Sequence, residues 1–156
     1  MDYINQTSMK KISLFVLVIM LFSSVLNAQI RSIPASVTDA FKSRYPHADN
    51  VAWKDKITYF EASFTVNGTD VTSDFSNKGE WKSSEAKTSY DALPTSVKDG
   101  FTKCQYADWT KGSVTELQHM GKSVQYRVYV EKSQPFQKRF LYFNANGKLV
   151  RDALGI

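Results

Sequence analysis

Apolar and polar residues alternate along this chain with two different periods, and each period predicts its own kind of element. Apolar side chains at Val37, Phe41 and Tyr45 recur at helical spacing behind Pro34, a residue that suits the first turn of a helix. Pro46 cannot continue such a helix, because it lacks a backbone donor. The sequence therefore predicts a helix that starts near Pro34 and stops by Pro46.

Beyond this helix the period changes to two. Phe60 and Phe64 lie at alternate positions between polar residues, a pattern typical of a strand with one buried face. Asn67-Gly68 favours a tight hairpin turn, because both residues tolerate a positive backbone φ. We expect the chain to return over residues 69–76 and to enter another strand near Trp81.

The second half of the chain shows the same alternation. Val128 and Val130 lie on one face of a predicted strand, with Arg127 and Tyr129 on the other. A returning strand is expected over residues 136–143. A last turn at Asn146-Gly147 leads into a final strand.

Three landmarks occur twice in the same order, which indicates an internal duplication. Residues 33–41 (IPASVTDAF) match residues 93–101 (LPTSVKDGF), 60 positions further on. The second match aligns Trp53 with Trp109, near which the first strand of each copy is expected. The third match aligns residues 74–81 with residues 142–149.

These elements predict an α+β fold made of two tandem repeats, about 33–86 and about 93–151, each with one helix and about four strands. The simplest arrangement is one antiparallel sheet of about eight strands with both helices packed on one face. With 42% hydrophobic and 22% charged residues, the chain can bury the core of one globular domain, predicted over residues 29–156.

Residues 1–28 have the pattern of a secretory signal peptide. Lys10 and Lys11 precede a largely apolar run from Ile12 to Phe22, and Ala28 is a candidate cleavage position. The run is too short for a membrane-spanning helix, which needs roughly 20 residues. We therefore expect an exported protein without a stable membrane span after cleavage, located in the periplasm or, as the alternative, outside the cell.

Charge and cysteine content narrow the classes of function. The net charge of +5 is mild, and the basic residues are scattered without a stripe, which disfavours nucleic acid as a partner. The single cysteine, Cys104, cannot form an internal disulfide, so the fold must depend on its core. Its place in the second helical pattern predicts a small buried side chain, with an intermolecular disulfide or a reactive thiol as the alternative.

No catalytic motif is recognisable, so we expect neither an enzyme nor a bound cofactor or metal. His47 and His119 have no ligand or catalytic partner at a suitable spacing, and both are expected at the surface. Asp70 and Asp74 share one face of a predicted strand. They could form a carboxylate pair or a weak Ca²⁺ site, but a solvated polar face is the simpler interpretation.

The solvent-facing side of the sheet is predicted to be unusually aromatic. Aromatic residues combined with arginine are enriched at protein interfaces. We hypothesise that this face binds or inhibits an envelope protein or peptide. The candidate partner-binding residues are Tyr59, Glu61, Arg127, Tyr129, Phe140 and Tyr142. In the alternative, these rings only cover one another through cross-strand pairing.

Other binding modes remain open at the level of sequence. An extended peptide could add to an edge of the sheet. Trp53, Trp81 and Trp109 could stack on sugars, although their positions at strand entries favour packing in the core. A structural or stress-related envelope protein without a discrete ligand is the remaining alternative.

The duplicated motifs resemble those of the β-lactamase-inhibitor-like, PepSY-like exported proteins. The resemblance rests on the helix opening Ile/Leu-Pro-x-Ser-Val, the strand entries at Trp53 and Trp109, and the Phe-x-x-x-Gly turns, and it spans roughly Ile33 to Arg151. It implies a tandem helix-plus-four-strand fold, an envelope location and no established activity. Those lactamase inhibitors carry disulfide-braced loops, whereas this chain has one cysteine. The resemblance therefore assigns an inhibitory role to no residue of this chain.

Overall fold

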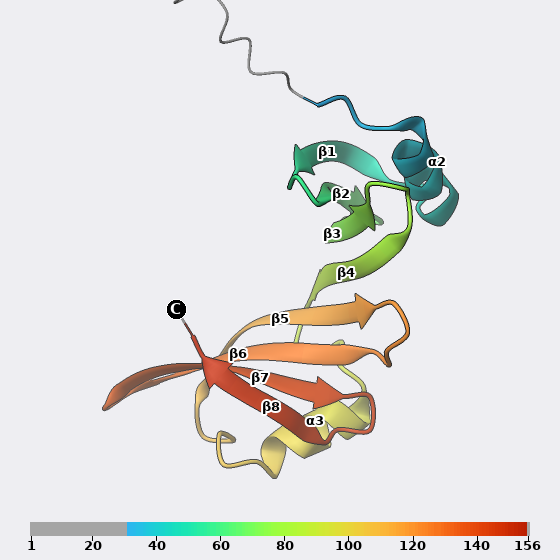
Figure 1. Cartoon of the computed structure of the whole chain (residues 1–156). Coiled ribbons are helices and arrows are strands. Elements are labelled where there is room, and N and C mark those ends of the chain that lie inside the picture. The colour runs from blue at the N-terminus through green and yellow to red at the C-terminus, as the bar shows by residue number, and fades with distance from the viewer. Residues whose placement is uncertain (1–30, 156) are drawn as a thin grey trace, which may run out of the picture. The chain divides into compact units, whose positions relative to one another are not determined.

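The computed structural model describes residues 31–155, and its compact unit begins at Ile33. The proposed signal peptide and its cleavage position lie outside the described residues. The elements are α2 (Ala35–Arg44), β1 (Asp49–Asp55), β2 (Tyr59–Val66), β3 (Thr69–Ser76), β4 (Trp81–Thr88), α3 (Thr95–Thr102), β5 (Thr110–His119), β6 (Gln125–Ser133), β7 (Phe136–Asn144) and β8 (Leu149–Leu154) (Figure 1).

The eight strands form one antiparallel sheet in which spatial order follows chain order from β1 to β8. The α+β fold predicted from the sequence is therefore confirmed. Each half consists of one helix followed by four strands, an order compatible with a duplication. Asn67 and Gly68 both adopt positive φ at the β2–β3 turn, as the sequence predicts.

Both helices lie on the same face of the sheet. Residues that pair directly across neighbouring strands share a face. The direct partners from β3 to β7 run through Val71, Ala86, Glu116, Tyr126 and Phe143. The first of these packs against the core under α2, and the last belongs to the core under α3. We call the opposite side of the sheet the helix-free face.

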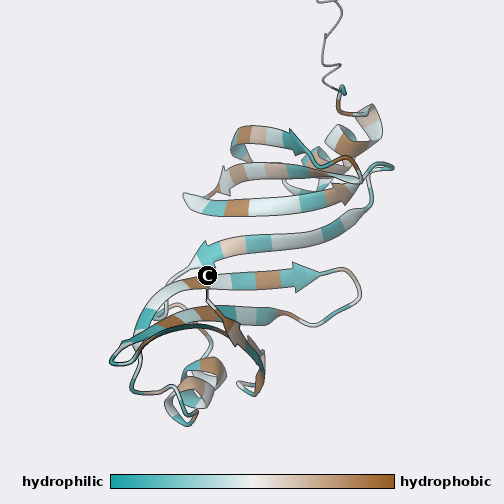
Figure 2. Ribbon diagram, turned by 60° about the vertical axis from the view of Figure 1, so that its left-hand side comes forward, coloured by the Kyte–Doolittle hydropathy of each residue, from teal (hydrophilic) through white to brown (hydrophobic). Residues whose placement is uncertain are grey.

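The buried residues form two separate core clusters, one under each helix. Val37 and Phe41 of α2 pack against Phe60, Phe64 and their neighbours on β2 and β3. The side chains of α3 pack in the same way against β6 and β7. Six apolar strand residues are all buried there, namely Phe60, Phe64, Val128, Val130, Leu141 and Phe143. Apolar and polar residues alternate along the strands (Figure 2).

The core under α2 contains a small polar network. The hydroxyl of Tyr45 lies 2.6 Å from Oγ of Ser84, which also accepts a hydrogen bond of 2.7 Å from Nε1 of Trp81. Oγ of Ser73 lies 3.1 Å from Oγ of Ser84. Because each of these buried hydroxyls has a partner, the network can stay in the core without the cost of an unsatisfied polar group.

Trp53 and Trp109, which align in the sequence, do not occupy equivalent positions in the sheet. Trp53 lies within β1 and pairs with Ala62, whereas Trp109 precedes the first residue of β5. Both side chains nevertheless pack in the cores, as does Trp81. The prediction of core packing is confirmed for all three tryptophans, of which Trp109 is buried and Trp53 and Trp81 are partly buried.

Candidate functional site

All six predicted partner-binding residues lie on the helix-free face, and each is half-buried. Each of β2, β6 and β7 carries two of them at alternate positions along the strand. They are Tyr59, Glu61, Arg127, Tyr129, Phe140 and Tyr142. The strand order places β3, β4 and β5 between the first two residues and the other four. The structure therefore divides the predicted surface into two groups.

The group on β6 and β7 is a compact cluster of rings and cations. Tyr129 and Phe140 pair directly across the strands, and their ring centroids lie 5.5 Å apart. The guanidinium of Arg127 lies 5.7 Å from the centroid of Phe140. On β8, the guanidinium of Arg151 lies 3.7 Å above the ring of Tyr142, a distance suited to a cation–π contact. We call this group the aromatic cluster.

The group on β2 is more dispersed and is surrounded by lysines. The ammonium of Lys82 lies 5.8 Å from the ring centroid of Tyr59. The carboxylate of Glu61 forms ion pairs with Lys56 at 3.5 Å and with Lys54 at 3.9 Å. Glu61 therefore has an intramolecular explanation, its two ion pairs, independent of any partner.

Tyr129 also has a clear structural task. A Cβ atom added to Gly112 would come within 2.5 Å of Cδ1 of Tyr129, so the ring covers bare backbone on β5. Aromatic side chains are known to shield glycines in sheets in this way. Cross-strand packing therefore accounts for Tyr129.

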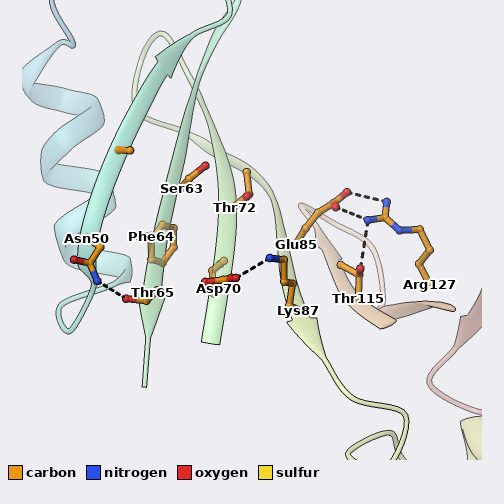
Figure 3. A pocket seen from close by; sticks show the side chains of 12 residues that line it. Asn50, Ser63, Phe64, Thr65, Asp70, Thr72, Glu85, Lys87, Thr115 and Arg127 are labelled. Atoms are coloured by element: carbon orange, nitrogen blue, oxygen red, sulfur yellow. Dashed lines mark hydrogen bonds and ion pairs between the residues drawn. The ribbon is translucent and has the colours of Figure 1, made fainter. Parts of the chain in front are cut away.

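Between the two groups, the helix-free face contains an open hollow of about 500 Å³ that extends from β1 to β6 (Figure 3). Most of its lining residues are polar. They are Asn50, Ala52, Ser63, Phe64, Thr65, Asp70, Val71, Thr72, Glu85, Lys87, Thr115 and Arg127. Of the six predicted partner-binding residues, only Arg127 is among them.

The charged residues of the hollow are arranged as two ion pairs. Nζ of Lys87 lies 2.7 Å from Oδ2 of Asp70, and Nη2 of Arg127 lies 2.7 Å from Oε2 of Glu85 (Figure 3). The same Nη2 atom also donates to the hydroxyl of Thr115 at 3.4 Å. These pairs orient the charged groups while leaving them at the surface, where another molecule can compete for them.

Two buried residues indicate that the helix-free face is concave at its centre. Thr115 and Leu117 of β5 belong to this face, yet only 9% and 3% of their surfaces are exposed. Leu117 belongs to neither core cluster under the helices. Its cross-strand neighbours on this face are Glu85 and Gln125. The sequence does not predict this region, because residues 110–119 show no regular alternation of apolar and polar residues.

Asp70 and Asp74 do share this face, as predicted, but they have different surroundings. Oδ2 of Asp74 accepts a hydrogen bond of 2.9 Å from Ser83, while its buried Oδ1 has no partner. Burial raises the pKa of Asp74, and the nearby carboxylates of Glu61 and Glu85 raise it further. Within residues 31–155, no group of three His, Cys, Asp or Glu side chains could hold a metal ion.

The remaining candidates for chemistry lie away from the hollow. His47 and His119 are exposed, as expected from the sequence. Cys104 is half-buried and packs against the core under α3, and burial raises the pKa of its thiol. Among the described helices, none has the length and apolar character needed to cross a bilayer.

Solved structures with the same fold come from several Bacteroides species. A "BLIP-like protein" from Bacteroides fragilis shares 25% identity, with a TM-score of 0.75 over 82% of this chain and 90% of that one. A protein of the "DUF2874 family" from Bacteroides uniformis shares 28% identity, with a TM-score of 0.73 over 78% and 88%. A protein from Bacteroides eggerthii, described as periplasmic, shares 26% identity, with a TM-score of 0.73 over 80% and 90%.

At the level of sequence families, residues 58–151 match the model described as "Putative beta-lactamase-inhibitor-like, PepSY-like". The matched range covers more than half of the chain and includes strands of both halves of the sheet. No curated protein matches the sequence.

Proposed function

Because the chain belongs to the β-lactamase-inhibitor-like, PepSY-like family, we propose that it is an exported, non-catalytic binding module. It binds a protein of the cell envelope on the helix-free face of its sheet. The family and its BLIP-like relative support the class of function, a binding or inhibitor-like module. The choice of face and the class of partner are our proposal.

The observation that carries the proposal is the hollow on the helix-free face. It is open, spans six strands and presents hydroxyl and charged groups from residues far apart in the chain. An enclosed small-molecule site is mostly apolar and buries most of its ligand. A wide polar depression next to half-buried rings is better suited to the irregular surface of another protein.

Two further observations support a binding role rather than catalysis. Each of the four charged residues that line the hollow is engaged in an ion pair with another of them. Neither histidine lies among the lining residues. The hollow thus presents fixed polar contacts without a nucleophile next to a general base, the arrangement that acyl-transfer or hydrolytic chemistry would require.

Export is supported by the leader pattern in the sequence and by a similar protein. The relative from Bacteroides eggerthii is described as periplasmic, and it is covered over most of its length by this chain. An envelope location would also supply protein partners that cytoplasmic chains do not meet.

The proposal can be tested by blocking the hollow without disturbing either core. Ser63 and Thr72 line the hollow and are half-buried on the helix-free face. Residues 29–156, carrying Ser63→Arg and Thr72→Arg together, would be used as bait on envelope extract beside the wild-type chain. We expect the wild type to retain a specific protein that the double variant loses.

A control variant adds one positive charge, in place of the two in the blocked variant, on the opposite side of the molecule. Ser43 is an exposed residue of α2, so Ser43→Arg should retain the same protein as the wild type. Circular dichroism and tryptophan fluorescence would verify that all variants fold. Equal capture by the wild type and the blocked variant would refute the proposed face, and loss with Ser43→Arg would point to the helix side.

A further inference from the structure

A row of directly paired residues crosses five strands of the helix-free face. It begins at the hollow and continues through the aromatic cluster. From β4 to β8 its members are Lys87, Thr115, Arg127, Tyr142 and Arg151. We call it the cationic row. Positive charges occupy every second strand, and a hydroxyl-bearing residue lies between each two of them.

The spacing of these charges follows from the geometry of the sheet. Neighbouring strands lie roughly 4.8 Å apart, so cations on alternate strands are about 10 Å apart. The first two cations are held by carboxylates of the chain itself, Asp70 and Glu85 (Figure 3). The third, Arg151, has no carboxylate within ion-pair distance among residues 31–155.

The side chain of Arg151 is available to bind an anion. Its guanidinium carbon lies 3.7 Å from the centroid of the Tyr142 ring, and its side-chain N–H groups form no hydrogen bond within residues 31–155. No hydrogen bond within residues 31–155 involves the hydroxyl of Tyr142, and Arg127 is its direct neighbour on β6. Donors from two strands and an adjacent second arginine therefore meet beside an aromatic surface.

The pattern favours a protein carboxylate over a polyphosphate or an anionic lipid surface. Phosphate-rich surfaces are bound by dense clusters of several lysines and arginines. Here single cations alternate with hydroxyl groups, and two of the three are locally neutralised. Planar guanidinium groups match the two oxygens of a carboxylate, and the rings beside them offer contact to apolar side chains.

We propose that the cationic row binds an acidic segment of the partner protein, with Arg151 and Tyr142 holding a carboxylate of Asp or Glu. This inference rests on the proposed function, because it assigns the chemistry of the partner on the same face. The carboxylate accepts hydrogen bonds from the guanidinium of Arg151 and the hydroxyl of Tyr142. Further acidic residues compete for Arg127 and Lys87.

Short poly-L-glutamate is the probe for this assignment, with poly-L-glutamine as its uncharged counterpart. Binding to residues 29–156 would be followed by NMR titration at low ionic strength. We expect glutamate-dependent shifts at residues around Tyr142 and Arg151. Arg151→Gln should weaken binding about tenfold, as expected for the loss of a charge-assisted hydrogen bond. Tyr142→Phe keeps the ring and should cause a smaller loss.

Lys103→Gln is the matched control, since it removes the same charge at an exposed position next to α3. It should change binding less than twofold. If Lys103→Gln and Arg151→Gln lose the same affinity for poly-L-glutamate, the net charge of the protein explains the binding and the assignment is overturned. Absence of binding to poly-L-glutamate would overturn it as well. So would tighter, Arg151-dependent binding to dextran sulfate or phosphatidylglycerol vesicles.

The capture experiment separates this inference from the proposed function. If Arg151→Gln retains the envelope protein that the blocked hollow loses, the helix-free face binds a partner and the cationic row is not its anchor. If no envelope protein is captured while glutamate binding depends on Arg151, the carboxylate site stands and the proposed function fails.

Discussion

At the scale of single residues, one glycine in each half of the sheet lies directly against the helix of that half. Gly79 and Gly147 follow β3 and β7 in corresponding turns, with φ of +89° and +82°. A Cβ atom at either position would overlap a backbone carbonyl at the start of a helix, that of Ser36 or that of Ser96. Both the dihedral and the close approach therefore require glycine.

Replacing the second of these glycines should be severely destabilising. We expect Gly147→Ala to lower the free energy of unfolding by about 3 kcal/mol or more, because it combines a strained φ with a backbone clash. Equilibrium urea denaturation measures the change. Gly68→Ala is the control, since Gly68 also has a positive φ, +77°, but open space around it. It should cost about 1 kcal/mol, and equal costs would contradict the account.

Asp74 should make stability depend on pH. Burial raises its pKa in the folded protein above the usual value, so the folded state binds a proton more readily than the unfolded state. Ionisation of Asp74 therefore lowers stability as pH rises through the raised pKa. We expect Asp74→Asn to be more stable than the wild type at pH 7, with the difference shrinking towards pH 4. A difference that is independent of pH would show that ionisation is not its cause.

At the scale of elements, the regular hairpins could be predicted from the sequence and β5 could not. The strand pair β2–β3 has strict alternation and an Asn-Gly turn, and its bounds match the expectation closely. In β5, a register shift between Lys111 and Val114 interrupts the alternation. The adjacent residues Val114 and Thr115 are both buried, on opposite faces. No period in the sequence describes such a strand.

The contact between β5 and β6 makes Tyr129 a stability determinant. Its ring covers Gly112 and packs on Phe140, so Tyr129→Ser should lower the free energy of unfolding by about 2 kcal/mol. Tyr59→Ser is a suitable comparison, because within residues 31–155 this half-buried ring has a contact with the ammonium of Lys82 but none with another aromatic ring. It should cost less than about 1 kcal/mol. If thermal denaturation shows equal losses, the glycine-covering role of Tyr129 is wrong.

At the scale of the whole sheet, two separate cores share one continuous set of hydrogen-bonded strands. The pairing of β4 with β5 joins the halves from Ser83–His119 to Thr88–Val114. We expect the described unit to unfold in one cooperative transition, as single domains of this size usually do. In Trp109→Phe, the remaining tryptophans report only on the core under α2. Their fluorescence and the far-UV circular dichroism should therefore change together in urea.

Two distinct transitions in that experiment would mean that the halves unfold independently.

Both helices and the sheet could be predicted from the sequence, because the hydrophobic period and the turn residues act locally. It could not locate the hollow, since that depends on how a long sheet curves and on residues such as Ser63 and Thr72, which carry no chemical signature. The aromatic residues that it singled out lie beside the hollow, and one of them, Tyr129, is explained by packing.

The central claim is that the helix-free face meets a partner, and photo-cross-linking in the living cell tests it most directly. A benzophenone amino acid would replace Thr72 in the hollow or Ser43 on the exposed side of α2. The account predicts a discrete cross-linked protein from position 72 and none from position 43. Cross-linking from position 43 alone, or from neither position, would contradict it.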